Sequence, residues 1–250
     1  MKVGVLGAMQ EEVSAVLAML ERPATTHVGS RDYTQGRLAG HEVITAHSRI
    51  GKVASASAAI ELLSRFGVEQ IIFLGLAGAL LPELTVGDII IAEGLMQHDM
   101  DASPLFPPLE VPLTGCSRFA TTPGISHRLA EAAQAVLNEQ SPALEGAERH
   151  STQLDRPPRI VRGDVATGDQ FIADVTARNR VLVRVPSAVC VEMEGAAVAQ
   201  VCQEYRTPFG IVRMISDAAD DSASSDFSAA LGRTTTDLSA AIVRRYLASL

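Results

Sequence analysis

Residues 1–20, MKVGVLGAMQEEVSAVLAML, hold the pattern that decides the fold. Val3–Leu6 is a short apolar run of strand length, and Glu11–Leu20 follows it with the spacing of a helix. The same pairing recurs where the helical segment Val53–Phe66 precedes the apolar run Ile71–Leu74. Strands that alternate with helices indicate an α/β protein.

The rest of the chain continues this alternation. Strands are predicted at Glu42–Ala46, Asp88–Ala92, Val161–Thr167, Ala188–Val191 and Gly210–Ile215, and helices at Ile125–Gln140, Ala173–Val183, Met193–Tyr205 and Ser228–Leu247. We therefore expect one domain over residues 1–250, in which helices flank a mixed, largely buried sheet.

Proline and polar residues mark the loops. Leu81-Pro82 predicts a turn, and the proline-rich segment from Pro104 to Pro112 predicts an ordered surface loop. The charged stretch from Ser141 to Pro158 interrupts the pattern after a long helix, so we interpret it as a loop insertion without a chemical role.

Composition narrows the function classes. The chain has 250 residues, of which 47% are hydrophobic and 20% charged, and a net charge of -8 that is spread along the sequence, so we expect no nucleic-acid partner. The opening apolar run is too short for an export signal, and no apolar stretch approaches the roughly 20 residues that cross a bilayer. Three scattered cysteines fit a reducing compartment, and we expect a soluble, cytoplasmic protein with no membrane partner.

Two glycine-containing segments come directly after apolar strands, where α/β sheets place ligands. In Gly7–Glu12 the acids Glu11 and Glu12 also have a structural explanation, because carboxylates are favoured at a helix N-terminus. The small residues of Gly75–Ala79, including Ala77 and Gly78, indicate a close approach either to packed backbone or to a flat ligand.

Two further segments combine charged residues with strand ends. In 191–197, VEMEGAA, the acids Glu192 and Glu194 flank Met193 and fall on the same side by alternation. In 212–220, VRMISDAAD, Arg213 lies within an apolar strand and needs a carboxylate partner, for which Glu192 and Glu194 are candidates. Ser216, or Asp220, is also suited to cap the following turn. We expect these two segments to converge.

Metal and cofactor chemistry is not indicated. The histidines lack metal-ligand spacing, and the stretch His98–Asp101 has no companion ligands, so we expect no metal. No motif implies a cofactor, and water is the only second substrate that we assign.

Taken together and in this order, the segments resemble the methylthioadenosine/S-adenosylhomocysteine nucleosidases of the purine and uridine phosphorylase superfamily. The resemblance covers nearly the whole chain and rests on GAMQEEV (7–13), RIGKV (49–53), GLAGAL (75–80), VGDI (86–89), HDMD (98–101), TGDQFI (167–172), VEMEGAA (191–197) and RMISDAAD (213–220). It implies a nucleoside phosphorylase-like fold, with a mixed twisted sheet that is partly barrel-like, and a homodimer.

The resemblance also implies roles for residues. Glu12 matches the residue that activates water, Glu194 the one that binds ribose hydroxyls beside Met193, and Asp217 the proton donor to the purine, supported by Ser216. Further matches are Phe171 for stacking on adenine, the Ile172 backbone for its polar edge, and Met9, Ile50 and Phe227 for an apolar pocket around the 5′ substituent. The loop with Leu105 and Pro112 matches one that reaches into the neighbouring subunit.

The implied reaction explains the acids. Cleavage of an N-glycosidic bond builds positive charge on ribose and negative charge on the purine, so one carboxylate must activate water while a neutral acid protonates the base. We therefore predict that burial raises the pKa of Asp217, while Glu12 stays ionised.

The chain departs from the family pattern at three places. Leu76 and Leu74 stand where small or hydroxyl-bearing residues are common, and residues 102–107 differ from the usual aromatic-glycine continuation. The preferred 5′ substituent is therefore open, and aminofutalosine is an alternative substrate. A phosphorylase is disfavoured because Gln10-Glu11-Glu12 would repel phosphate. A non-catalytic nucleoside-binding protein is a third alternative.

Overall fold

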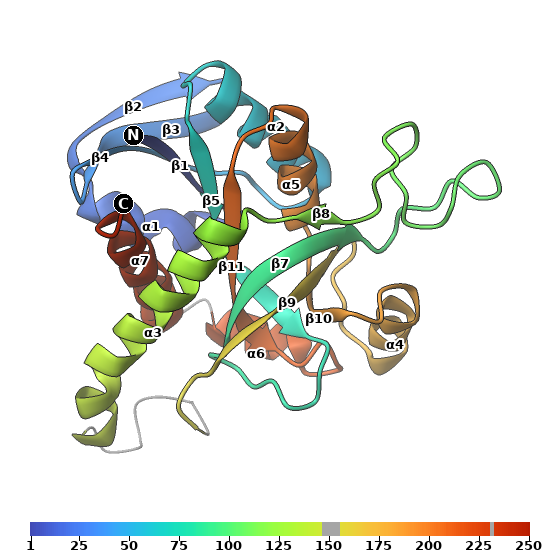
Figure 1. The fold of residues 1–250 in the computed structure, drawn as a ribbon. Helices are drawn as coiled ribbons and strands as arrows, with labels where there is room; N and C mark the ends of the chain where they lie inside the picture. The colour runs from blue at the N-terminus through green and yellow to red at the C-terminus, as the bar shows by residue number, and fades with distance from the viewer. Residues whose placement is uncertain (147–155, 231–232) are drawn as a thin grey trace.

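The alternating strands and helices build one sheet between helical layers (Figure 1). The computed structural model describes residues 1–146, 156–230 and 233–250. Its strands are β1 (Lys2–Gly7), β2 (Glu21–Val28), β3 (Arg31–Leu38), β4 (His41–His47), β5 (Gln70–Phe73), β6 (Leu76–Ala79), β7 (Ile89–Gln97), β8 (Phe119–Ala120), β9 (Ile160–Thr167), β10 (Ala188–Glu192) and β11 (Phe209–Asp217). The helices among these residues are α1 (Gln10–Met19), α2 (Lys52–Ser64), α3 (Pro123–Gly146), α4 (Val175–Arg184), α5 (Gly195–Glu204), α6 (Ala223–Ala230) and α7 (Arg233–Leu247).

The sheet closes on itself in its second half. The strand order is β2-β3-β4-β1-β5-β11-β6-β10-β9-β7-β8, and β7 also pairs with β11. Strands β11, β6, β10, β9 and β7 therefore form a ring, while β1, β5 and β11 run parallel in the open half. This single α/β domain with a partly barrel-like mixed sheet is the fold that the sequence predicted.

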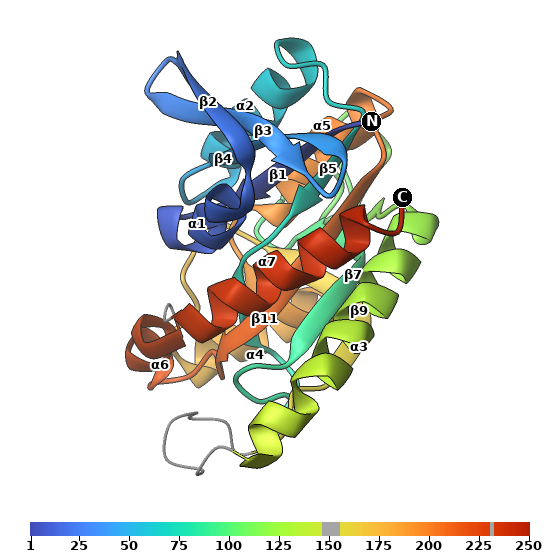
Figure 2. The same ribbon diagram turned by 90° about the vertical axis from the view of Figure 1, so that its left-hand side faces the viewer.

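Helices cover the sheet on two sides. Helix α3 packs against α7, and both cross the sheet in front of β7 and β11 (Figure 2). Their apolar faces and that of α1 enclose one core with β1, β5 and β11. Helices α2 and α5 pack together on the opposite side over a second core. Sheet faces covered on both sides explain why the central strands read as continuous apolar runs.

The sequence analysis missed four strands. β2 is almost wholly exposed, and β3 is mostly polar with Tyr33 and Leu38 as its large apolar residues, so neither strand carries an apolar run. They form an antiparallel extension beside β4, where one sheet face can contact water. No strand was predicted for the small residues of Gly75–Ala79, but β6 lies there and pairs with β10 and β11. β8 has only two residues.

Two helix boundaries were wrong. Helix α3 continues to Gly146, so residues 141–146 of the predicted loop insertion are helical. Residues 147–155 of that segment, with His150, lie outside the described residues. The helix predicted at Ser228–Leu247 is instead described as α6 and α7, and α6 begins at Ala223. The earlier start was not predicted because residues 222, 224 and 225 are serines, and serine favours turns over helix interiors.

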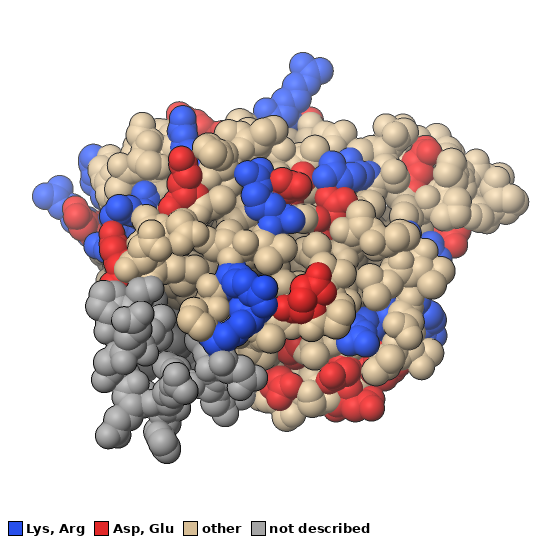
Figure 3. Space-filling view, turned by 60° about the horizontal axis from the view of Figure 1, so that its bottom comes forward, with Lys and Arg blue, Asp and Glu red and all other residues tan. Residues whose placement is uncertain are grey.

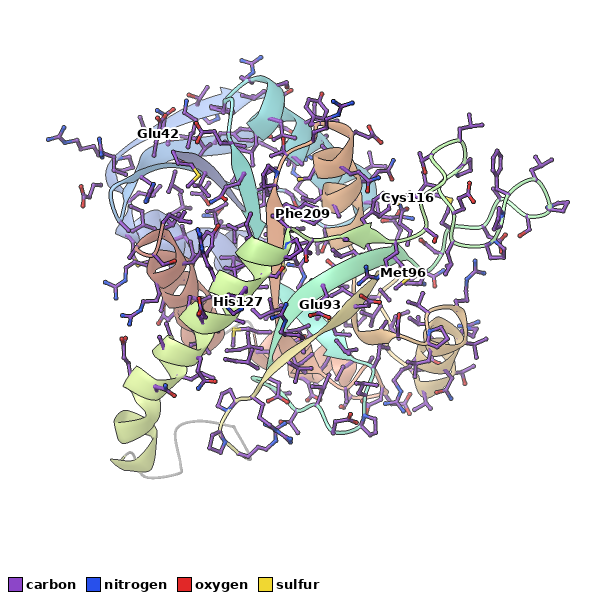
Figure 4. The ribbon with its side chains drawn as sticks, viewed as in Figure 1. Glu42, Glu93, Met96, Cys116, His127 and Phe209 are labelled. Carbon is purple, nitrogen blue, oxygen red and sulfur yellow. The ribbon has the colours of Figure 1, made fainter. Side chains whose placement is uncertain are left out.

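The segment between β7 and β8 projects from the body (Figure 1). Met96 lies near the end of β7, where this segment leaves the sheet, and Cys116 lies close to its return (Figure 4). As predicted, residues 104–112 form neither helix nor strand.

Among the described residues, no helix is both long and apolar enough to span a membrane. On the face drawn in Figure 3, basic and acidic side chains are interspersed.

Candidate active site

One cavity of about 350 Å³ collects the residues singled out in the sequence. Those that line it are Met9, Glu12, Ile50, Ala77, Gly78, Phe171, Glu192, Met193, Glu194, Ser216, Asp217 and Phe227, together with Ala8, Leu76 and Val191. Ile172 lines a smaller hollow of about 30 Å³ that shares Gly78, Phe171 and Asp217 with it. Arg213 lies behind the wall and does not line the cavity.

Strand register brings these residues together. Gly78 of β6 pairs with Asp217 of β11 on one side and with Val191 of β10 on the other. A bulge at Ser216 interrupts the β11 ladder just before Asp217, and such bulges re-aim side chains next to functional sites. A Cβ at Gly78 would lie 2.8 Å from Oδ1 of Asp217, so only glycine leaves room for this carboxyl group.

The Glu12 carboxyl group is fixed by backbone amides. Its Oε2 accepts hydrogen bonds from the amides of Ala8 (2.6 Å) and Met9 (3.0 Å), and its Oε1 accepts one from Leu76 (3.0 Å). The side chain is buried, and burial raises its pKa, although the charge of Arg213 and the three amides act in the opposite direction. From the sequence we expected a raised pKa only at Asp217, but in the structure the pKa of Glu12 is raised as well.

Arg213 pairs with Glu192, one of its two predicted partners. Nη2 of Arg213 lies 2.5 Å from Oε2 of Glu192, and both side chains are almost completely buried. The guanidinium also stacks over Phe73, with 4.2 Å between its carbon and the ring centre. Glu192 further accepts hydrogen bonds from the Thr167 hydroxyl and the Gly195 amide. The predicted convergence of the two acidic segments is confirmed.

Glu194 stands at the N-terminus of α5, where its Oε1 accepts a 2.8 Å hydrogen bond from the Gly51 amide. Burial and the neighbouring charge of Glu192 raise its pKa to about 8. Three buried acids, Glu12, Glu192 and Glu194, thus share the single positive charge of Arg213. Since Arg213 bonds directly to Glu192, the other two acids are only partly compensated.

Asp217 is 3% exposed and has the raised pKa predicted from the sequence. Burial is the main cause, and the charges of Asp226 and Asp220 add to it. The Ser216 hydroxyl, 2.7 Å from Oδ2, and the Ala219 amide, 2.9 Å from Oδ1, act against this rise. Because burial outweighs these hydrogen bonds, the site favours the neutral acid.

The mouth of the cavity is apolar. Phe171 is 48% exposed and Ile50 is 53% exposed, which is unusual for such large apolar side chains. The Phe171 and Phe227 rings pack in a T-shaped arrangement, with 5.8 Å between ring centres. Exposed rings and aliphatic side chains around a polar floor are typical of pockets for flat, partly apolar ligands.

The comparisons with known proteins agree on a family. Residues 2–248 match the model of the phosphorylase superfamily. The 5′-methylthioadenosine/S-adenosylhomocysteine nucleosidase of Shewanella pealeana is 31% identical over 229 residues, which are 91% of this chain and 90% of the relative. The chain belongs to this nucleosidase family.

Solved structures support the nucleosidase family assignment. The nucleosidase of the same name from Neisseria meningitidis, in complex with methylthio-immucillin-A, superposes with a TM-score of 0.85 at 31% identity and covers 100% of this chain and 99% of that one. The futalosine hydrolase of Helicobacter pylori superposes with a TM-score of 0.84 at 31% identity, covering 100% and 98%.

Sequence reasoning missed residues that position the nucleosidase-family motifs. Thr167 and Gly51 hold Glu192 and Glu194 from other segments, and Ala8 donates to Glu12 through its backbone. Their side chains carry no charge, so only the family motifs that contain them, TGDQFI, RIGKV and GAMQEEV, could have marked them. Within the described residues, no group of three or more His, Cys, Asp or Glu side chains is arranged to hold a metal ion.

Proposed function

We propose that this protein hydrolyses the N-glycosidic bond of 5′-thio-substituted adenosines such as methylthioadenosine and S-adenosylhomocysteine, releasing adenine and a 5′-thioribose. The observation that carries the proposal is the pair of buried carboxyl groups, Glu12 from α1 and Asp217 from β11, which line the same apolar-mouthed cavity. The related nucleosidases and the inhibitor complex support the choice of substrate class.

Glu12 is the proposed base. Three amide hydrogen bonds fix its two oxygens and offset part of the cost of burying its charge. Burial raises its pKa, and a carboxylate with a raised pKa is the stronger base towards water. In this role Glu12 takes a proton from water as the oxygen attacks the anomeric carbon of the ribose.

Asp217 is the proposed acid. Burial raises its pKa, so the neutral form can give a proton to the departing adenine as the glycosidic bond breaks. Ser216 steadies the carboxyl group through its hydroxyl. The proton neutralises the negative charge that develops on the base, which lowers the barrier to bond cleavage.

The other lining residues fit the parts of a nucleoside. Glu194, beside Met193, is placed to accept hydrogen bonds from ribose hydroxyls, and Phe171 is placed to stack on the adenine, whose polar edge the Ile172 backbone would meet. Met9, Ile50 and Phe227 offer apolar contacts for the 5′ substituent. These assignments combine the position of each side chain with its family match.

Water is a better second substrate than phosphate for this cavity. Among the described residues that line it there is no lysine or arginine, and Arg213 is already paired with Glu192 behind the wall. A phosphate beside Glu12 and Glu194 would meet negative charge without a cation to offset it. Hydrolysis is therefore favoured over phosphorolysis.

A second candidate substrate is aminofutalosine or another 5′-modified adenosine. The 31% identity to the Helicobacter pylori futalosine hydrolase equals that to the Neisseria meningitidis nucleosidase, which supports this alternative. Leu76 lines the cavity and adds apolar bulk beside Glu12. Apolar contacts discriminate weakly between substituents, by about 1–3 kcal/mol per methylene, so several substrates can be accepted.

We also propose that the protein acts as a homodimer in the cytoplasm. The projecting segment carries Leu105 and Leu113, which are 83% and 90% exposed, and a second copy would cover them. All three cysteines are free thiols, which supports a reducing compartment.

The test is adenine release by the purified protein from methylthioadenosine, S-adenosylhomocysteine and aminofutalosine, with and without phosphate. We expect release that is independent of phosphate, with kcat/KM falling at low pH as Glu194 and Glu12 are protonated and at high pH as Asp217 ionises. Asp217→Asn should lower kcat by roughly 10²–10⁴-fold. The exposed Asp221→Asn is the matched control and should keep full activity.

The outcomes separate the alternatives. Ribose 1-phosphate formed only in the presence of phosphate would make the protein a phosphorylase. A marked preference for aminofutalosine would keep the protein a nucleoside hydrolase but change its assigned substrate. Tight nucleoside binding without any release of base would identify a binding protein instead.

A further inference from the structure

Glu194 depends on a backbone amide from a distant segment. The Gly51 amide that donates to it belongs to the residue just before α2, and Gly51 has a φ of 101°, a conformation that favours glycine. Whatever holds the start of α2 therefore also holds Glu194.

The start of α2 is held by an ion pair. Nζ of Lys52 lies 2.7 Å from Oδ1 of Asp99 and 3.1 Å from Oε1 of Gln97. The Lys52 and Asp99 side chains are only 17% and 21% exposed, so water screens their attraction less than on an open surface. This pair joins α2 to the end of β7.

A third segment closes the arrangement. Oδ1 of Asp169 accepts a 2.8 Å hydrogen bond from the Lys52 amide, and the Asp169 amide donates a 2.9 Å hydrogen bond to Oδ2 of Asp99. Asp169 lies two residues before Phe171 in the segment between β9 and α4. The ring of Lys52, Asp99 and Asp169 thus links three segments outside the cavity, and we call it the Lys52 clasp.

We propose that the Lys52 clasp is a positioning device for the active site, in which Lys52, Asp99 and Asp169 hold the Gly51 amide against Glu194 and the segment of Phe171 in place. None of the three side chains lines the cavity. The inference rests on the proposed function only for its effect on catalysis, since the link between the segments is a property of the fold.

The contacts within the clasp lower the pKa of its Asp99 carboxyl group. Burial alone would raise the pKa of Asp99, but the hydrogen bonds from Lys52 and from the Asp169 amide outweigh it and lower the pKa. His98, packed against Gly168 on the same stretch, has a lowered pKa through burial. The Asp99 carboxyl group therefore stays ionised in the neutral pH range.

Loosening the clasp has a defined electrostatic consequence. The Gly51 amide lowers the pKa of Glu194, as does the charge of Arg213 from β11, whereas Glu192 from β10 and Glu12 from α1 raise it. If the amide moves away, the pKa of Glu194 rises further, and its charge is lost at a higher pH than in the wild type. Ribose binding by ionised Glu194 then weakens at neutral pH and recovers at alkaline pH.

The experiment compares Asp99→Asn and Lys52→Met with two controls, Asp101→Asn and Lys2→Met. Asp101 lies two residues from Asp99 but pairs with Arg184, and Lys2 pairs with Glu42. Hydrogen exchange is followed in residues 49–53 and 168–172, with the amides of β1 as internal reference. The pH profile of kcat/KM for adenine release is measured on the same samples.

We expect both clasp variants, and neither control, to exchange about tenfold faster in these two segments while β1 is unchanged. Their kcat/KM at pH 7 should fall about tenfold, as for the loss of a charge-assisted hydrogen bond, and the acidic limb of the profile should move to higher pH. Exchange and profiles equal to those of the controls would overturn the inference, as would lower activity without faster exchange in residues 49–53. If the wild type releases no adenine, the proposed function fails, while the exchange data still decide the clasp.

Discussion

At the scale of single residues, the candidate active site is dominated by an excess of buried negative charge. Glu12, Glu192 and Glu194 lie around one guanidinium. Of the residues that the structure describes, only Glu192 forms an ion pair with Arg213. Backbone amides supply the remaining partners of Glu12 and Glu194. Such a cluster costs folding free energy and shifts pKa values in the direction that acid–base chemistry requires.

Replacing Glu194 by Gln should stabilise the protein at alkaline pH. The folded protein keeps the Glu194 proton up to about pH 8, whereas the unfolded chain releases it near 4.5, so the free energy of unfolding falls as pH rises between these values. A glutamine does not ionise, so this fall in the free energy of unfolding is absent, and its side-chain oxygen still accepts the hydrogen bond from the Gly51 amide. We expect the free energy of unfolding at pH 8 to rise by roughly 1–3 kcal/mol, with no difference near pH 4. Urea unfolding at both pH values measures it.

Glu192→Gln is the matched control for that prediction. This change removes the carboxylate that Arg213 contacts directly and leaves the buried guanidinium without its ion-pair partner. It should destabilise the protein by about 3–5 kcal/mol. If both substitutions changed the free energy of unfolding equally, the conclusion that Arg213 compensates Glu192 more than Glu194 would be contradicted.

At the scale of elements, the closed ring of strands aligns the proposed catalytic groups. Strand β6, with only four residues, runs between β10 and β11 and pairs with both. Its glycine at 78 lets the Asp217 carboxyl group approach the backbone, and the bulge at Ser216 turns Asp217 towards the cavity. The position of the proposed acid is therefore set by strand pairing rather than by a loop.

Gly78→Ala tests this dependence on close approach. The new Cβ would lie 2.8 Å from Oδ1 of Asp217 and 3.2 Å from Cβ of Ala219, so the carboxyl group must move. We expect kcat/KM to fall about a hundredfold and the free energy of unfolding by about 1–3 kcal/mol.

Gly124→Ala provides the control because a Cβ at Gly124, in the first turn of α3, meets nothing within 4 Å. This substitution should leave activity unchanged and stability equal or slightly higher, as alanine favours helix. Adenine-release kinetics and urea unfolding of both variants give the comparison, and full activity of Gly78→Ala would exclude the steric argument.

At the scale of the whole molecule, the segment between β7 and β8 projects from the body (Figure 1). This segment exposes large apolar side chains. A single chain gains nothing from holding Leu105 and Leu113 in water. Their burial against a second copy would offset that cost and is the physical basis of the proposed homodimer.

Leu105→Asp should therefore weaken self-association. A charge buried in an apolar contact is strongly unfavourable, so the fraction of dimer should fall at micromolar concentration, and KM should rise if the segment completes the neighbouring site. Sedimentation velocity and adenine-release kinetics measure the two effects.

Val183→Asp is the control, because Val183 of α4 is 80% exposed and lies outside the projecting segment. It should leave the oligomeric state unchanged. A monomeric wild type, or the same response from both variants, would contradict the dimer proposal.

The sequence by itself determined the fold class and most of the site. Apolar runs and helical periods located the buried strands and most helices, because buried elements carry strong hydrophobic patterns. The need of a buried Arg213 for a counter-ion predicted its pairing with Glu192 or Glu194, and the family motifs marked the residues that line the cavity.

Only the tertiary structure decided the rest. The exposed hairpin β2–β3 and the short strand β6 lack a hydrophobic signature, so their pairing depends on neighbours distant in sequence. The raised pKa of Glu12 follows from burial, which no local pattern encodes. The Gly51 amide that holds Glu194 comes from 143 residues away, because hydrogen bonds between such segments form only once the chain has folded.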